Sequence, residues 1–370
     1  MCRFLIIFGT VLILSMGFMS PLASLAATPA SWDSVLSKAR AEGTVSVAGP
    51  GTASVRQALT KPFEDRYGIK VEYDGGRSSS QKTKIMNQRS AGIYQVDLWV
   101  AGFGTIEGLN IRDVFDPLEP ALLLPDIKDP KNWLNGFLWH DLKDRRFFAH
   151  TSRLFGGLAV NPHRVKADEV TSLKDLLKPQ YKGKIVSDDP RVAGAGQGLF
   201  VYLYLTKEFG FGPGFIKKLI EDQEVVFTRN GRQAADWIVN GRYLLWPQPG
   251  QREVSELKAK GVPLEHRCLD DGQWLSVGAG GVGLFNKAPH PNAAVIYLNW
   301  LLGKEGQAYY SKEGDTASRR LDVPAPADIA PCFIPQAGKK YFWVDSQKAL
   351  ETRKPGGELV QFLTSISTRN

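Results

Sequence analysis

Apolar positions in the first part of the chain alternate between helical and strand spacing. A Ser suited to cap a helix opens residues 31–43, and a Gly closes them. TVSVA (44–48) then alternates with the period of a strand. This alternation of helix and strand patterns repeats along the chain, which predicts an α/β fold with a mostly parallel sheet. The expected helices cover 31–43, 55–68 (broken or bent at Pro62) and 80–92, and the expected strands cover 44–48, 69–73 and 96–100.

Three loops follow these predicted strands, at 49–54, 75–80 and 101–105. Ligands of parallel sheets bind where the carboxyl ends of the strands converge. The second loop lies in the stretch GGRSSSQ (75–81). This stretch places a guanidinium and three hydroxyls between a predicted strand and a predicted helix. Gly-Gly and a capping Ser explain the stretch as an ordinary turn. The same groups, with the backbone N–H groups of a helix start, also suit a bound anion.

The middle of the chain predicts a second unit of strands and helices. Strands are expected over 147–160 and 183–190, and the glycines of RVAGAGQG (191–198) precede another helix. The adjacent acids Asp188 and Asp189 resemble a general acid and base, but neighbouring residues on a strand point to opposite faces. A strand-end Asp more often caps the next helix. A strand from 243 is expected to run into the turn WPQPGQRE (246–253).

The first residues predict export. An apolar run over 4–18 follows Arg3, and small residues follow at 24–28, which is the order of a secretory signal peptide cleaved after Ala26. The run is shorter than the ~20 apolar residues that span a bilayer. We therefore expect a mature, periplasmic chain. Its remaining cysteines, Cys268 and Cys332, either form a disulfide or stay separate thiols.

Composition narrows the function classes. The chain has 370 residues, 43% of them hydrophobic, which suits two domains with large cores. Its net charge of +8 favours anionic partners, but it has no basic block or aromatic-interleaved basic stripe, so we expect no nucleic-acid binding. It has five histidines and neither H-E-x-x-H nor G-x-S-x-G. An enzyme is therefore not expected, although a periplasmic hydrolase or transferase on the same fold remains an alternative.

The stretch NKAPHPNAAVIYLNWLLGKEGQAYYSKEGDTASRRLDV (286–323) closely resembles the C-terminal helix pair of family 1 extracellular solute-binding proteins, the receptors of ABC importers. The ferric-ion-binding branch is the most similar. Its motifs appear as K-E-G-Q (304–307) and R-x-D-V (320–323). Upstream stretches such as FEDRYGIKVEY, VDLWV and SLKDLLKPQYKGKIV extend the resemblance over most of the mature chain.

The resemblance implies a type II periplasmic-binding-protein fold of two α/β lobes. Lobe one would comprise 27–152 plus 286–370, and lobe two 153–285, with crossovers near 154–160 and 277–285. GAGGVG (278–283) matches a dinucleotide-binding motif literally, but prolines follow where a helix should begin, so we interpret it as a flexible hinge strand. A solute would be trapped by hinge closure. A monomer without a cofactor would then deliver it to the importer's permease in the inner membrane.

One departure from the ferric branch concerns the metal ligands. That branch implies two adjacent tyrosines, because phenolate oxygen suits Fe(III). WPQPGQRE (246–253) has none, and the pair Tyr309–Tyr310 lies in the C-terminal helix. We therefore expect no metal site. A small anionic solute, phosphorylated or carboxylated, is the expected ligand, and ferric iron or an iron chelate is the alternative.

The expected ligand contacts come from both lobes. On lobe one they are Gly51, Thr52, Arg77, Ser78, Ser79, Ser80, Phe103 and Gly104, and on lobe two Arg191, Gly194, Gly196, Arg229, Trp246 and Gln248. Arg77 and the three serines, assisted by Thr52 and the backbone of Gly51, would hold the anionic group. The arginines, glycines and Gln248 of lobe two would close on it, while Phe103 and Trp246 would flank an organic body.

Overall fold

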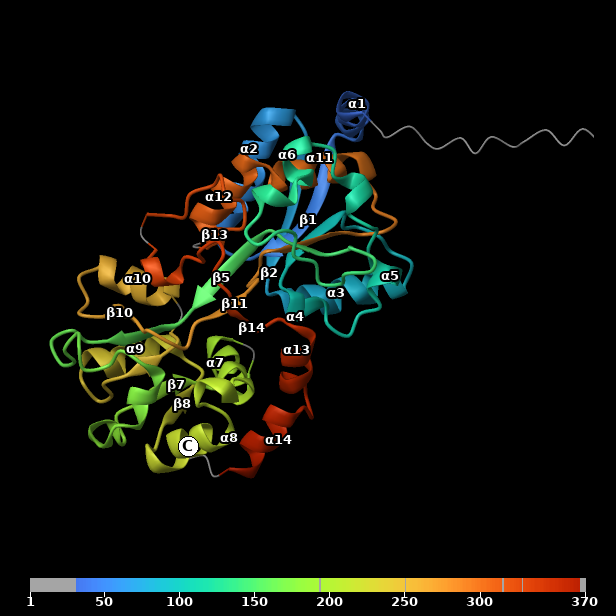
Figure 1. Cartoon of the computed structure of the whole chain (residues 1–370). Coiled ribbons are helices and arrows are strands. Elements are labelled where there is room, and N and C mark those ends of the chain that lie inside the picture. Colours follow the sequence, from blue (N-terminus) through green and yellow to red (C-terminus); the bar gives the residue numbers. More distant parts are fainter. Residues whose placement is uncertain (1–30, 193, 250, 315, 328, 367–370) are drawn as a thin grey trace, which may run out of the picture.

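The structure is a computed structural model that describes residues 31–192, 194–249, 251–314, 316–327 and 329–366. Figure 1 shows two bodies of mixed helices and strands, with β5 and β11 running between them. The α/β prediction is confirmed, but the sheets are mixed and not mostly parallel, because the strands that return between the lobes pair antiparallel. The predicted signal peptide lies outside the described residues. Within the described ranges, no helix has the length and apolar character needed to cross a membrane.

The first elements of lobe one follow the predicted rhythm. Ser31 caps the first helix by accepting a hydrogen bond from the Ser34 N–H, and Gly43 ends it in the left-handed region at φ 72°. The second helix continues through Pro62, so it is not broken there. The elements are α1 (Trp32–Glu42), β1 (Thr44–Pro50), α2 (Ala53–Tyr67), β2 (Lys70–Gly76), α3 (Ser78–Ser90), β3 (Leu98–Ala101), α4 (Phe103–Ile106), α5 (Ile111–Val114) and α6 (Pro125–Lys128).

The sheet of lobe one has the order β2-β1-β3-β12-β4, with β4 at Phe148–Ala149 and β12 at Gly281–Leu284. β1 is parallel to both β2 and β3, so Val47 lies between Tyr73 and Leu98 in register. β12 returns antiparallel to β3. The carboxyl ends of the three parallel strands therefore lie at one edge of the sheet.

Two apolar helices from late in the sequence complete this core. α11 (Pro291–Leu302) and α12 (Lys304–Gly314) pack against α2. Phe63 of α2 meets Tyr297 and Trp300 of α11 with ring centroids 4.9 and 5.4 Å apart. Nine of the twelve residues of α11 are buried, which explains why its sequence is apolar on nearly every face.

Lobe two has a small sheet in the order β10-β6-β9, with β10 at Glu265–Cys268, β6 at Gly157–Val160 and β9 at Trp246–Pro247. A parallel bridge between Ile185 and Leu245 joins it to the parallel pair β7 (Val186–Asp188) and β8 (Val226–Thr228). The strand predicted from 243 is thus only two residues long. The helices are α7 (Ala195–Leu205), α8 (Pro213–Lys217) with a π turn at Lys218–Asp222, α9 (Gly231–Val239) and α10 (Gln251–Ala259).

The crossover strands are β5 (Thr151–Phe155) and β11 (Trp274–Ser276), which pair antiparallel between the lobes and are flanked by β13 (Ala317–Ser318) and β14 (Phe342–Trp343). The crossovers predicted at 154–160 and 277–285 are therefore displaced, since β6 and β12 belong to the lobe sheets. The glycines after β11 permit close packing. Gly278 has φ 59°, and a Cβ on Gly280 would lie 1.6 Å from the Thr151 Oγ1.

The C-terminal segment corrects the predicted lobe boundary. α13 (Gln347–Arg353) and α14 (Glu358–Ser365) were expected in lobe one. Their buried residues Ala349, Leu359 and Leu363 instead join the core cluster of lobe two, together with Leu199 of α7. The reason is the apolar face of each helix, which is buried against α7. Figure 1 shows both helices beside lobe two.

Cys268 and Cys332 form a disulfide with their Cα atoms 5.6 Å apart, which decides between the two alternatives that the sequence left open. The bond joins β10 to the 3-10 helix Pro331–Phe333. It therefore ties lobe two to the chain that follows β13.

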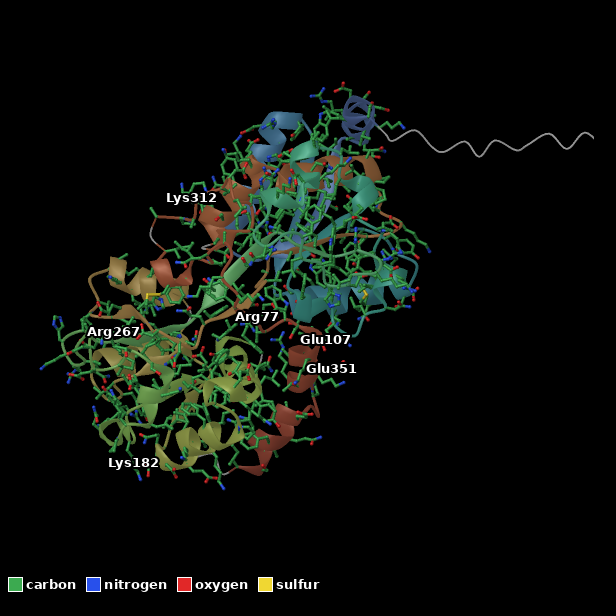
Figure 2. All side chains as sticks on the ribbon, in the orientation of Figure 1. Arg77, Glu107, Lys182, Arg267, Lys312 and Glu351 are labelled. Atoms are coloured by element: carbon green, nitrogen blue, oxygen red, sulfur yellow. A yellow bond between two sulfur atoms is a disulfide. The ribbon has the colours of Figure 1, made fainter. Side chains whose placement is uncertain are left out.

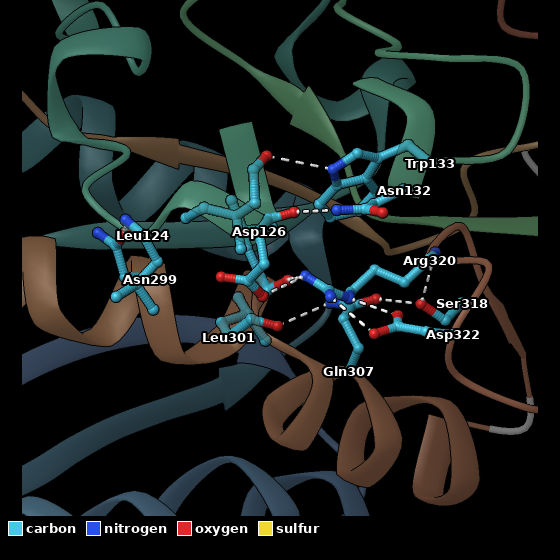
Figure 3. A network of polar contacts seen from close by, with 12 residues as sticks. Leu124, Asp126, Asn132, Trp133, Asn299, Leu301, Gln307, Ser318, Arg320 and Asp322 are labelled. Carbon is cyan, nitrogen blue, oxygen red and sulfur yellow. Dashed lines mark hydrogen bonds and ion pairs between the residues drawn. The ribbon is translucent and has the colours of Figure 1, made fainter. Parts of the chain in front are cut away.

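The two family motifs have structural roles. Gln307 of K-E-G-Q contacts the His150 Nδ1 at 2.9 Å and accepts a hydrogen bond from the Ser318 Oγ at 2.7 Å. Arg320 of R-x-D-V donates to the carboxylates of Asp322 and Asp126. Figure 3 shows this network, in which the buried Arg320 connects three separate segments of lobe one. Buried charges need such pairing, so the motifs stabilise the fold.

Candidate functional site

Three helices begin directly after the parallel strands of lobe one. β1, β2 and β3 end at Pro50, Gly76 and Ala101, and α2, α3 and α4 start at most three residues later. Thr52 and Arg77 occupy the cap positions of α2 and α3, and neither side chain makes a capping hydrogen bond. Neither helix has an acid in its first turn. Unpaired N–H groups at helix starts favour a negative charge.

The loop around Arg77 is open. Arg77, Ser79 and Ser80 are exposed and Ser78 is half-buried. Among the described residues, Arg77 makes no ion pair. Gly51 lies against the same loop, since a Cβ on it would be 3.2 Å from the Gly76 Cα. Figure 2 places Arg77 on the side of lobe one that faces lobe two.

Ser54 adds a group that the sequence interpretation missed. It lies in the first turn of α2, and its buried Oγ has no hydrogen-bond partner among the described residues. The available signal was a second hydroxyl two residues after Thr52. A buried hydroxyl without a partner is costly, so this atom is a candidate for a contact from outside the chain.

Two aromatic residues do not have the predicted role. Phe103 is 2% exposed and packs against His140 and Trp343, with ring centroids 5.2 and 6.4 Å away. Trp246 is fully buried, and its Nε1–H donates to the Asp188 Oδ1 at 3.1 Å. Neither ring can flank a ligand in this conformation, because both fill a core. Gly104 is exposed near Arg353 of α13.

The two arginines of lobe two share one buried carboxylate. Asp189 is 3% exposed, and it accepts hydrogen bonds from the Nε of Arg191 at 2.7 Å and the Nε of Arg229 at 2.9 Å. Burial alone would raise the pKa of Asp189, but these hydrogen bonds lower it overall. Asp188 instead accepts from Trp246, so each carboxylate has a structural partner. The pair is not arranged as a general acid and base.

The starts of α7 and α4 flank the same crossover. A Cβ on Gly198, in the first turn of α7, would lie 2.3 Å from the Trp274 ring, and one on Gly102 would lie 2.3 Å from the Gly278 oxygen. Trp274 and Gly278 are four residues apart, about 13 Å of extended chain. The helix starts of the two lobes are therefore close neighbours. The predicted Gly194 caps α7, and Gly196 is buried against the Asp188 backbone.

Gln248 lies at the corresponding edge of lobe two. It follows β9, beside the ends of β7 and β8 from which Arg191 and Arg229 continue. It has φ 55°, a region that non-glycine residues rarely adopt. Its side chain is buried, and neither atom of its amide has a hydrogen-bond partner among the described residues.

The described residues show no metal centre. No group of three or more His, Cys, Asp or Glu within them is arranged to hold an ion. His150 is buried, which lowers its pKa to about 3 and keeps it neutral. Tyr310 is buried and donates to the Ala279 oxygen, whereas Tyr309 is 40% exposed. The adjacent tyrosines therefore do not act together as a ligand pair.

Comparison with known proteins identifies the class. A family model described as a bacterial extracellular solute-binding protein matches residues 58–331. An uncharacterized protein of Haemophilus influenzae is 25% identical over 334 residues, which cover 86% of this chain and 90% of that protein. The chain is thus a solute-binding protein by class. It belongs to the bacterial extracellular solute-binding family, which confirms the resemblance found in the sequence.

Solved structures share the fold. A Clostridium perfringens ABC transporter protein superposes with a TM-score of 0.67 at 17% identity, covering 87% of this chain and 99% of that chain. The periplasmic binding protein AfuA of Actinobacillus pleuropneumoniae, with fructose-6-phosphate bound, gives 0.61 at 20% identity (86% and 97%). Trichodesmium FutA, in complex with iron and citrate, gives 0.67 at 15% identity (88% and 100%).

Proposed function

We propose that this protein is the periplasmic receptor of an ABC importer and traps a small anionic solute, phosphorylated or carboxylated, between its lobes. The observation that carries the proposal is Arg77, which has no ion pair among the described residues and lies at the uncapped start of α3, beside three hydroxyls and a second uncapped helix. Family membership supports the receptor role. The position of these groups after the carboxyl ends of parallel strands supports the ligand site, because ligands of such sheets bind there.

The available interactions are strong enough for such a role. A helix start contributes about 0.3–1 kcal/mol to anion binding, and up to ~2 where it is partly buried. A charged hydrogen bond adds roughly 1.5–3 kcal/mol. Two helix starts and two or three such bonds sum to roughly 4–13 kcal/mol before ordering costs, a range that includes the ~8 kcal/mol of micromolar affinity. Closure would add contacts from Arg191 and Arg229, which Asp189 holds in place.

Turnover is not part of the proposal. His150 is buried and neutral, and both acids of the 188–189 pair have structural partners. Native mass spectrometry of protein purified from the periplasm, with iron analysis of the same sample, would identify a retained solute. Thermal-shift screening of phosphates and carboxylates would then rank its affinity. We expect saturable binding of an anion, whereas iron held without a chelating anion would contradict the proposal.

Arg77→Ala should weaken binding of the best anion by about 10–100-fold, because it removes the unpaired cation at the start of α3. The measurement is isothermal titration calorimetry at fixed ionic strength. Arg66→Ala is the matched control, since Arg66 is also exposed but lies in the last turn of α2, at the end away from the loop, where it pairs with Glu305. It should leave affinity unchanged. Equal affinities of wild type and the Arg77 variant would show that the anion binds elsewhere.

A further inference from the structure

Gln248 is an anomaly that the proposed anion site does not explain. A buried amide has two donors and an acceptor to satisfy, and neither polar atom of this one has a partner among the described residues. The residue also has the left-handed backbone at φ 55°. Buried polar groups are nearly always paired, and strained backbone tends to cluster at functional sites. Gln248, at the carboxyl ends of the lobe-two strands, therefore combines an unpaired buried amide with an unfavourable backbone conformation, and each of these features costs free energy.

A second unpaired group lies close to it. The backbone N–H of Gln248 donates to the Gly157 oxygen at 2.9 Å. Two residues away along the chain, about 7 Å, Phe155 stacks on Trp274 with ring centroids 4.0 Å apart. Trp274 is 2% exposed, and its indole N–H has no hydrogen-bond partner among the described residues. The two orphaned groups therefore flank the same crossover between β5 and lobe two.

The side chains of Gln248 and Trp274 are polar but uncharged. An amide offers donors and an acceptor, and an indole N–H is a donor only. Neither carries a charge that would hold an anion, which the charged residues of both lobe edges supply. Together they match neutral groups that both donate and accept hydrogen bonds. Hydroxyls on the body of a solute have this property.

We infer that Gln248 and Trp274 form a subsite for the hydroxyl groups of the solute, so that the natural ligand is a hydroxylated anion, either a polyol phosphate or a hydroxycarboxylate. The inference rests on the proposed function, because the anionic group must bind at Arg77 for the body to reach the crossover. Gln248 and Trp274 are 1% and 2% exposed in this conformation, so the inference requires that a relative movement of the lobes uncovers them.

Matched probe pairs test this subsite without knowledge of the natural solute. Glycerol 3-phosphate and propyl phosphate share a charged group and differ in hydroxyls, as do tartrate and succinate. We expect the wild-type protein to prefer the hydroxylated member of at least one pair by about tenfold or more, since a site built for a hydroxyl rejects a ligand that lacks it. A preference within the phosphate pair would indicate that the natural solute is a polyol phosphate, and a preference within the carboxylate pair would indicate a hydroxycarboxylate.

Gln248→Leu removes both polar atoms at similar volume. We expect it to raise Tm, because the amide is unpaired in the free protein, and to reduce the preference to threefold or less. Affinity for the unhydroxylated probe should change by less than twofold. Trp274→Phe removes the N–H and retains an aromatic ring, and should reduce the preference partly. Gln223→Leu is the control, because Gln223 is also buried with an unpaired amide oxygen but belongs to the far side of lobe two.

The outcomes separate the two proposals. A wild-type protein that binds propyl phosphate or succinate with no preference for the hydroxylated partner overturns the subsite and leaves the anion proposal standing. A preference for the hydroxylated probe that persists in Gln248→Leu would also overturn the subsite. An unchanged Tm in that variant would overturn it too, because it would indicate that an ordered water already pairs with the amide. Failure of all four probes and of the wider anion panel to bind overturns both proposals.

Discussion

The two lobes present their cationic groups in opposite ways. On lobe one, Arg77 is exposed and has no ion pair among the described residues. On lobe two, Arg191 and Arg229 are both fixed by the buried Asp189, so that this cluster carries a net charge of only +1. Among the described residues, no carboxylate holds the Arg77 side chain of lobe one in place, whereas Asp189 holds both arginines of lobe two in place.

This difference separates affinity from stability. Removing the exposed Arg77, which has no ion pair among the described residues, should change the stability of the folded protein little but should remove a direct contact to a bound anion. The Asp189 cluster stabilises lobe two and also holds its donors in a fixed orientation, which lowers the cost of ordering them around a ligand. We therefore expect perturbations of lobe two to affect folding and those of the Arg77 edge to affect binding.

Loss of the disulfide should produce the largest effect on stability. Replacing Cys268 and Cys332 by Ser should lower the free energy of unfolding by roughly 4 kcal/mol, because the bond closes a loop of 64 residues in the unfolded chain. Hydrogen exchange read by mass spectrometry should show the greatest loss of protection in β10 of lobe two, which the bond anchors, and a smaller loss in α2 of lobe one, which lies outside the closed loop. Reductant should reproduce the effect in wild type and do nothing further to the variant. Equal loss of protection in both lobes would contradict this comparison.

Asp189→Asn should have an intermediate effect. It removes the charge that pairs with two arginines, and we expect a loss of about 1–2 kcal/mol in urea unfolding, below the value for fully buried pairs because the arginines are 38% and 67% exposed. Arg77→Ala should change stability by less than about 0.5 kcal/mol. A similar loss in both variants would remove the distinction between the two edges.

The smallest effect should appear in the pH dependence of stability. The pKa of Asp189 lies below its ordinary value of 3.8 because the hydrogen bonds from Arg191 and Arg229 outweigh its burial. Its contribution is therefore complete above about pH 4 and is lost as pH falls through the lower folded pKa. The Tm difference between wild type and Asp189→Asn should be constant from pH 7 to 5 and shrink between pH 4 and 2. A difference that grows on acidification would contradict the sign of the shift.

The sequence predicted much of the fold because its signals are local. Helical spacing, the Ser31 cap and the terminal Gly43 involve near neighbours, and the structure confirms α1, β1, β2, α3 and β3 close to their expected positions. The turn of GGRSSSQ into a helix was likewise readable, since the strand, the glycines and the serines are contiguous. The placement of α13 and α14 was wrong, because the core that an amphipathic helix covers depends on segments far away in the sequence, here α7.

The candidate site was only partly predictable for the same reason. Arg77 and its serines were identified as a local motif, but the burial of Phe103 and Trp246 arises from partners far along the chain. Nothing near Gln248 in the sequence indicates that its amide is left without a partner.

The amino-acid sequence by itself determined the α/β alternation, the family and the hydroxyl-rich loop at the start of α3, because each depends on periodicity or on adjacent residues. Tertiary structure alone decided which arginines are neutralised, since Asp189 meets Arg229 only through the pairing of β7 with β8. It also decided which polar groups remain unpaired, because burial is a property of packing between distant segments.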